Sequence, residues 1–95
     1  MNVVWTAGAD ADREELLKNI AEDNPAAADG FDDLIDATTW RLAAFPAMGK
    51  LGRVTGTREF VAHQRYRIVY SVEIDSITVL AVEHTSRQSR PIYSP

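Results

Sequence analysis

Cysteine is absent from this chain of 95 residues, which excludes a disulfide framework and a thiolate metal site. Histidine occurs only at His63 and His84, and two histidines without cysteine rarely form a metal site. No apolar run approaches the roughly 18 residues of a membrane span. The N-terminus also lacks the basic start and apolar stretch of a signal peptide. These absences predict a cytoplasmic protein without a metal or cofactor.

The signatures of several enzyme classes are missing as well. The sequence has no glycine-rich phosphate loop, no GxSxG elbow, no HExxH and no carboxylate pair at a diagnostic spacing. At this length the chain has room for one small domain, and neither an internal repeat nor a linker divides residues 1–95. Its 45% hydrophobic and 25% charged residues are ordinary for a folded domain.

The net charge of −4 is unevenly distributed along the chain. Residues 1–40 contain ten acids and two bases, whereas residues 41–95 contain eight bases and four acids. Such polarity favours two faces with different roles, the basic one suited to an anionic partner. Two solvated surfaces of opposite sign that attract each other would explain the same distribution.

The beginning of the chain predicts a strand followed by a helix. Asn2–Trp5 is a short apolar run typical of a strand. From about Asp10 to Asp23, apolar residues fall on one stripe at helical spacing, with charges elsewhere. Thr6 or Asp10 supplies a side chain that can cap the start of this helix.

A second helix is predicted directly after the first. Asn24 and Pro25 form a typical start, with an N-cap residue followed by proline at the first helical position, and Pro46 and Gly49 end the helix. Two antiparallel helices with a short joint result. The expected core residues of this region, including both tryptophans, are Trp5, Phe31, Leu34, Ile35, Thr38, Trp40, Leu42 and Phe45.

After Gly56 the period of the pattern changes from 3.6 to 2. Arg58–Ala62, Tyr66–Val72 and Ile77–Val82 are predicted strands on short turns, which gives an antiparallel meander. The order β-α-α-β-β-β is an α+β fold, with an N-terminal strand and an antiparallel helical hairpin packed on a three- to four-stranded antiparallel sheet. Arg67 is expected on the other face of that sheet, left for solvent or a partner.

The basic half contains mostly arginine, whose planar donors suit phosphate and carboxylate groups. Tyrosines interleave with the arginines, either as stacking partners for bases or as half-buried strand aromatics. The tyrosines are Tyr66, Tyr70 and Tyr93. The candidate residues for binding a partner are Arg53, Arg58, Arg65, Arg67, Arg87 and Arg90.

The sequence resembles the RelE/ParE superfamily of toxins from bacterial type II toxin–antitoxin modules. The resemblance covers nearly the whole chain and depends on a set of weak motifs in family order. These are Val3–Thr6, Glu22–Pro25, Phe45–Gly49, Gly52–Glu59, Tyr66–Tyr70 and Val82–Gln88. The resemblance implies a helical hairpin on a curved antiparallel sheet, and an antitoxin that wraps and neutralises the toxin.

The superfamily divides by target, and whether this chain is an enzyme depends on the branch. RelE-like members cut messenger RNA on the ribosome without a metal, which requires a base, cations for the phosphate and an acid. In that reading the resemblance makes Arg67, Arg87 and Tyr93 candidate catalytic residues. His84 or His63 is the candidate base, because an imidazole titrates near neutrality. The strand expected to bring lysines begins Arg58-Glu59-Phe60-Val61 and has none. Arginine is a poor base because it stays protonated.

The Gly-Thr-Arg-Glu and His-Thr-Ser-Arg segments are closer to ParE-like toxins, which implies inhibition of DNA gyrase through a binding surface. We favour this branch and keep the ribosome-dependent nuclease as the alternative; a decayed toxin without toxicity also stays open. The expected partners are a partly disordered antitoxin and gyrase, or the ribosome with its message. Operator DNA would be contacted only through the antitoxin, and no membrane partner is expected.

Overall fold

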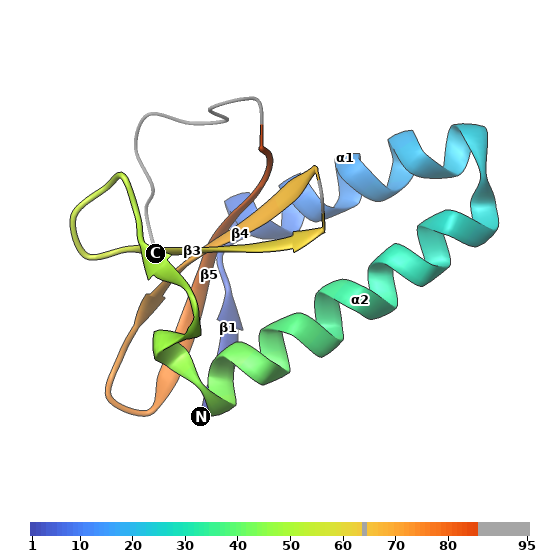
Figure 1. Ribbon diagram of the computed structural model, residues 1–95. Helices are drawn as coiled ribbons and strands as arrows, with labels where there is room; N and C mark the ends of the chain where they lie inside the picture. Colours follow the sequence, from blue (N-terminus) through green and yellow to red (C-terminus); the bar gives the residue numbers. More distant parts are fainter. Residues whose placement is uncertain (64, 86–95) are drawn as a thin grey trace.

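The computed structural model describes residues 1–63 and 65–85. Its elements follow in the order β1 (Asn2–Trp5), α1 (Ala7–Asp23), α2 (Pro25–Ala44), the 3-10 helix η1 (Pro46–Met48), β2 (Lys50–Leu51), β3 (Arg58–His63), β4 (Tyr66–Val72) and β5 (Ser76–His84). The α+β class and the order of strand, helical hairpin and meander are therefore confirmed. Both helices lie on one side of the sheet, and their connected ends extend past it (Figure 1).

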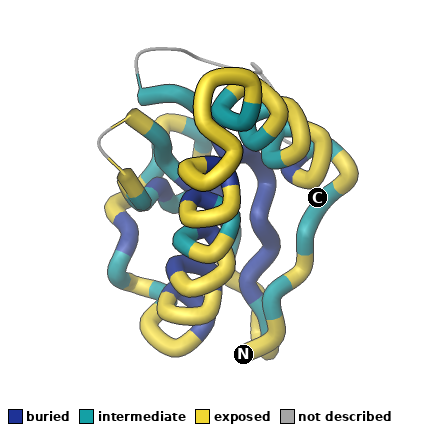
Figure 2. The backbone as a smooth tube through the Cα atoms, turned by 90° about the vertical axis from the view of Figure 1, so that its right-hand side faces the viewer, coloured by how far each residue is buried: buried dark blue, intermediate teal, exposed yellow. Residues whose placement is uncertain are grey.

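The sheet has one strand more than expected, and one of its pairings is parallel. Its order is β1-β5-β4-β3-β2, and β1 runs parallel to β5 while the other pairs are antiparallel. The additional strand is β2, which the sequence did not predict because two residues are too few for a visible period of 2. β5 lies between β1 and β4 and is buried from Ile77 to Glu83, visible as the long dark-blue segment in Figure 2.

The helix boundaries follow the expected capping residues. Thr6 caps α1 by accepting the Ala9 backbone N–H with its hydroxyl, so α1 begins at Ala7, earlier than the apolar stripe indicated. Asn24 both ends α1 and caps α2, where its side chain accepts the Ala27 N–H at 3.2 Å. Pro25 stands at the first helical position, where its missing N–H costs nothing.

The core lies between the helices and the sheet. Leu42 of α2 is fully buried with Ile68 and Tyr70 of β4 and with Ile77 and Val79 of β5. Trp5 packs partly buried against this cluster, so its expected core position is confirmed. The Arg13 guanidinium lies 4.9 Å from the centroid of the Trp5 ring and pairs with Asp32 and Asp36 of α2. One side chain thereby links β1, α1 and α2.

Two expected core residues are instead exposed. Trp40 is 62% exposed and Phe45 is 67% exposed, so the prediction that they are core residues was wrong. Trp40 follows the fully buried Ile35 by five residues, a rotation of about 140° around the helix axis, which places it away from the sheet. Phe45 is the C-cap of α2, with φ −132° and ψ 74°, so its side chain leaves the apolar stripe where the helix ends.

Candidate functional site

The face of the sheet opposite the helices carries a cluster of two arginines and two glutamates, Arg53, Glu59, Arg67 and Glu83, which we call the charged cluster. Arg67 Nε lies 2.6 Å from Glu83 Oε1 and 3.7 Å from Glu59 Oε1. Arg53 bonds Glu59 through its backbone N–H and its guanidinium, and also pairs with Glu83. Glu59 and Glu83 are both buried. Each of the two carboxylates faces the guanidinium groups of both Arg53 and Arg67.

The sequence positions this cluster by strand alternation and by one loop. Glu59, Arg67 and Glu83 lie on neighbouring strands, with Arg67 directly opposite Glu83, and opposite charges across strands attract. Arg53 comes from the loop between β2 and β3, which the Gly52 N–H closes by donating to the Thr57 carbonyl at 2.8 Å. A Cβ at Gly52 would collide with the Thr57 hydroxyl and would lie 3.2 Å from the Thr57 carbonyl oxygen, so this turn favours glycine.

The charged cluster lowers the pKa of Glu59. Burial by itself would raise the pKa of this carboxyl, but the Arg53 backbone N–H and guanidinium donate to it and Arg67 adds a second positive charge. These contributions outweigh burial, so the pKa lies below its ordinary value. The two glutamates therefore balance the two arginines, and Arg53 and Arg67 contribute little net positive charge to this face.

The structure divides the candidate catalytic residues between the two faces of the sheet. Tyr66 lies opposite His84, and Arg67 lies opposite Glu83. Since successive side chains of a strand point to opposite faces, His84 and Arg67 are separated by the sheet. The Tyr66 ring meets Phe31 of α2 at 5.0 Å and His84 at 5.4 Å, which places His84 on the helix side. Arg87, Arg90 and Tyr93 lie outside the described residues.

Two other predicted residues have structural contacts that the sequence did not indicate. Arg58 donates from Nη1 to the Gly49 carbonyl at 2.7 Å. The Tyr70 hydroxyl accepts the Gly49 N–H at 3.0 Å and donates to the Pro46 carbonyl at 2.7 Å. Burial raises the pKa of this hydroxyl, although the Gly49 N–H and Arg58 act in the opposite direction. Tyr70 therefore fixes the turn after α2 and is not available for stacking.

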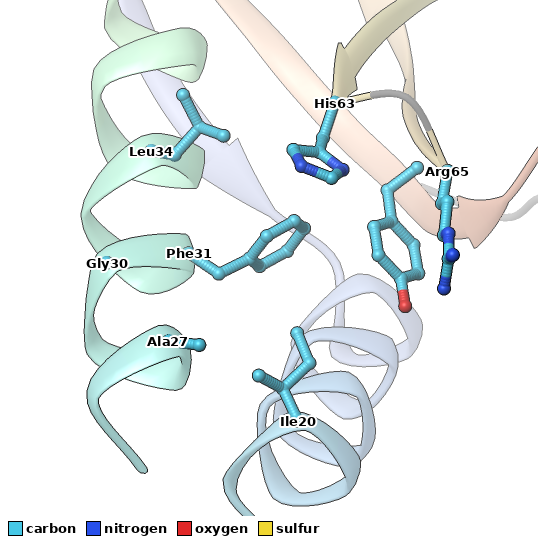
Figure 3. A pocket seen from close by; sticks show the side chains of 8 residues that line it. Ile20, Ala27, Gly30, Phe31, Leu34, His63 and Arg65 are labelled. Carbon is cyan, nitrogen blue, oxygen red and sulfur yellow. The ribbon is translucent and has the colours of Figure 1, made fainter. Parts of the chain in front are cut away.

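A pocket of about 490 Å³ opens where the connected ends of the helices pass the hairpin of β3 and β4. Figure 3 shows aliphatic and aromatic side chains from α1 and α2 on one side, and His63 and Arg65 from the hairpin on the other. We call it the hairpin pocket, and it is lined by Ile20, Ala27, Gly30, Phe31, Leu34, His63, Arg65 and Tyr66. Of these, the sequence indicated Arg65 as a binding candidate and His63 as an alternative to His84 for the base. It left Tyr66 open between a stacking partner and a half-buried strand aromatic.

Comparison with known proteins identifies the family. Residues 3–89 match the model of the ParE toxin of type II toxin–antitoxin systems, parDE. The chain belongs to the ParE toxin family. A curated relative from Sinorhizobium fredii, the protein Y4kP, bears the name of a toxin and is 35% identical over 85 residues, covering 88% of each chain.

Solved structures share the fold of this ParE-family toxin. A chain from the chromosomal ParDE system of P. aeruginosa aligns with a TM-score of 0.76 and 20% identity, over 88% of this chain and 95% of the other. A copper-bound mutant toxin from Helicobacter pylori gives 0.68 and 19%, over 90% and 96%. The YoeB/ParE toxin from Agrobacterium tumefaciens gives 0.57 and 18%, over 88% and 98%. At these identities the structural likeness concerns the fold.

Within residues 1–63 and 65–85, no three or more histidine, aspartate or glutamate side chains gather as they would around a metal ion. In the same part of the chain, no helix has the length and apolar character to cross a membrane.

Proposed function

We propose that this toxin arrests growth by binding DNA gyrase in the cytoplasm and that a cognate antitoxin neutralises it. The observation that carries this proposal is the division of Arg67 and His84 between opposite faces of the sheet. A nuclease needs its base, its acid and its phosphate-binding cations around one phosphate. A toxin that acts by occupying its target needs a binding surface alone.

The pairing of Arg67 supports the same proposal. Its side chain is 14% exposed and its Nε already donates to the buried carboxylate of Glu83. If this guanidinium bound a phosphate, the buried carboxylate of Glu83 would lose one of its two positively charged partners. Such a loss is costly for a buried charge. A ribosome-dependent nuclease that uses Arg67 would have to break this pair first.

An antitoxin is the second expected partner, because the family is that of toxins from toxin–antitoxin systems. We expect apolar side chains of a partly disordered antitoxin to dock along the helical hairpin, since such segments gain their affinity by folding on a large surface. Acidic side chains of the antitoxin would meet arginines of the basic half, for which Arg58, Arg67 and Arg87 are the candidates. Arg58 and Arg67 are bonded within the chain, so pairing with them would require an exchange of partners.

The proposal is tested with purified toxin and purified DNA gyrase in a supercoiling assay. The wild-type toxin should inhibit supercoiling, and an excess of the cognate antitoxin should restore it. Arg67→Ala and His84→Ala should retain inhibition as long as they stay folded, because neither performs chemistry in this account. Full gyrase activity in the presence of folded toxin would contradict the proposal.

A further inference from the structure

Gly30 destabilises α2, and no contact within the described fold explains it. It lies in the interior of the helix, where glycine is less favourable than alanine because it orders a freer backbone. A Cβ placed on Gly30 would have nothing within 4 Å, so no close packing against this position requires glycine. The residue lines the hairpin pocket. The absence of a side chain at Gly30 leaves space in the hairpin pocket for an atom of a bound partner.

Arg65 is the cation at the rim of the same pocket. The other arginines of the described residues each have a hydrogen-bond acceptor: Arg13, Arg41, Arg53, Arg58 and Arg67. Within residues 1–63 and 65–85, the Arg65 guanidinium has no hydrogen bond or ion pair, and the residue is exposed. An arginine without a hydrogen-bond acceptor in the described residues, next to an apolar pocket, is suited to bind a carboxylate of a partner. The apolar side chain next to that carboxylate would occupy the pocket.

The wall of the pocket is already assembled in the isolated chain. Phe31 meets the Tyr66 ring edge-on at 5.0 Å, with 74° between the planes, and meets the His63 ring at 6.0 Å and 75°. Phe31 is also buried. Such packing fixes the orientation of the rings, so a ligand meets a pre-formed site and does not have to order it.

A pre-formed pocket suits a folded partner better than a disordered one. A segment that folds on binding adapts its own shape to the surface it covers. A folded enzyme presents side chains in fixed positions, and complexes between pre-organised partners need complementary shapes in advance. The hairpin pocket therefore suits the folded target, and an antitoxin that docks along the helical hairpin would cover the pocket and block the target.

We propose that the hairpin pocket is the site at which the toxin captures its folded target, taking an apolar side chain beside Gly30 and binding an adjacent carboxylate with Arg65. This inference depends on the proposed function, in which the target is DNA gyrase. Asp29 and Asp33 are exposed on α2 on either side of Gly30 in sequence. Their charge repels a carboxylate there, so the apolar group faces α2 and the carboxylate faces the strand hairpin.

Two substitutions separate the pocket from the fold. Gly30→Phe places a ring in the open space of the pocket, and Gly30→Ala is its smaller counterpart. Arg65→Glu reverses the charge at the rim, and Arg65→Lys keeps it. Ile74→Ser is the remote control, because Ile74 is 99% exposed in the turn between β4 and β5. The melting temperature of each variant establishes that it folds.

The measured quantity is the toxin concentration that half-inhibits supercoiling by purified DNA gyrase. Gly30→Phe and Arg65→Glu should each raise it by about tenfold or more, a loss typical of one good contact. Gly30→Ala should raise this concentration less than Gly30→Phe does, and Arg65→Lys should raise it less than Arg65→Glu does. Ile74→Ser should leave the concentration unchanged. All variants should keep a wild-type melting temperature or a higher one. They should still bind the co-expressed cognate antitoxin, because its contacts along the helical hairpin extend well beyond this pocket.

Three results would overturn the inference in distinguishable ways. If the wild type inhibits gyrase and Gly30→Phe and Arg65→Glu inhibit equally well, the pocket is not the target site while the proposed function stands. If both variants lose the antitoxin and keep gyrase inhibition, the pocket belongs to the antitoxin. If the wild type itself leaves gyrase active, the proposed function fails and the assignment of gyrase to this pocket fails with it.

Discussion

The two faces of the sheet are buried by different kinds of interaction. On the helix side, Leu42, Ile68 and Ile77 are fully buried among apolar neighbours, and the hydrophobic effect there is independent of pH. On the opposite face, the buried Glu59 and Glu83 are balanced by Arg53 and Arg67. Such a balance depends on every member keeping its charge. The contrast shows that arginines which the sequence marks as cations, here Arg53 and Arg67, can contribute almost no free positive charge once they are paired in the described part of the fold.

The largest effect is expected on the apolar face. Leu42→Ala should lower the free energy of unfolding by about 2–5 kcal/mol, because it removes a fully buried side chain and leaves a cavity. Urea denaturation measures this loss. Trp40→Ala on the exposed side of the same helix is the matched control, with a change within about 0.5 kcal/mol. Equal losses from the two substitutions would mean that the core has been misplaced.

A somewhat smaller effect is expected in the charged cluster. Glu83→Gln should cost about 3 kcal/mol in unfolding free energy, because it leaves Arg53 and Arg67 with one carboxylate between them. Glu73→Gln, at an exposed residue in the turn between β4 and β5, serves as the control and should change stability by less than about 0.5 kcal/mol. A negligible loss for Glu83→Gln would show that the pairs do not contribute to stability.

The two faces should also differ in their response to acid. The pKa of Glu59 lies below its ordinary value of 4.5, so the stability that its charge contributes is present above pH 4.5 and is lost as the pH falls through the folded pKa. The difference in unfolding free energy between wild type and Glu59→Gln should therefore shrink below pH 4.5. Leu42→Ala should show a loss that does not depend on pH. A constant difference for Glu59→Gln would contradict the lowered pKa.

The smallest effect is a gain of stability. Gly30→Ala should raise the unfolding free energy by about 0.5–1 kcal/mol, because alanine favours the helix and its methyl group meets open space. Thermal denaturation measures this gain as a higher melting temperature. A loss of stability would show that Gly30 has a structural role in α2, which would remove one of the three observations on which the proposed target site depends.

Much of the fold could be predicted because local patterns determine it. The caps at Thr6 and Asn24, the apolar stripe of the second helix and the alternation in Tyr66–Val72 each depend on a few neighbouring residues. The parallel pairing of β1 with β5 could not be predicted in this way. It joins Asn2 to Ser76 and Trp5 to Val79, and no local pattern specifies a partner that distant in sequence.

The site was less predictable than the fold for the same physical reason. The sequence identified Arg53, Arg58 and Arg67 as cations, but their partners Glu59, Gly49 and Glu83 are selected by strand register and loop geometry. An acid in the interior of a predicted strand, as at Glu59 and Glu83, was the available signal, because carboxylates are rarely buried without a partner. The hairpin pocket combines three separate segments of the chain, and Gly30 within a helix was its one local sign.

The central claim is that the toxin acts by binding and not by cutting RNA. The most direct test adds the purified wild-type toxin to a bacterial translation extract and maps the 5′ ends of a message by primer extension. This account predicts an intact message at toxin concentrations that inhibit gyrase. Ribosome-dependent cuts in phase with codons, absent with Arg67→Ala or His84→Ala, would contradict it and would make those residues part of an active site.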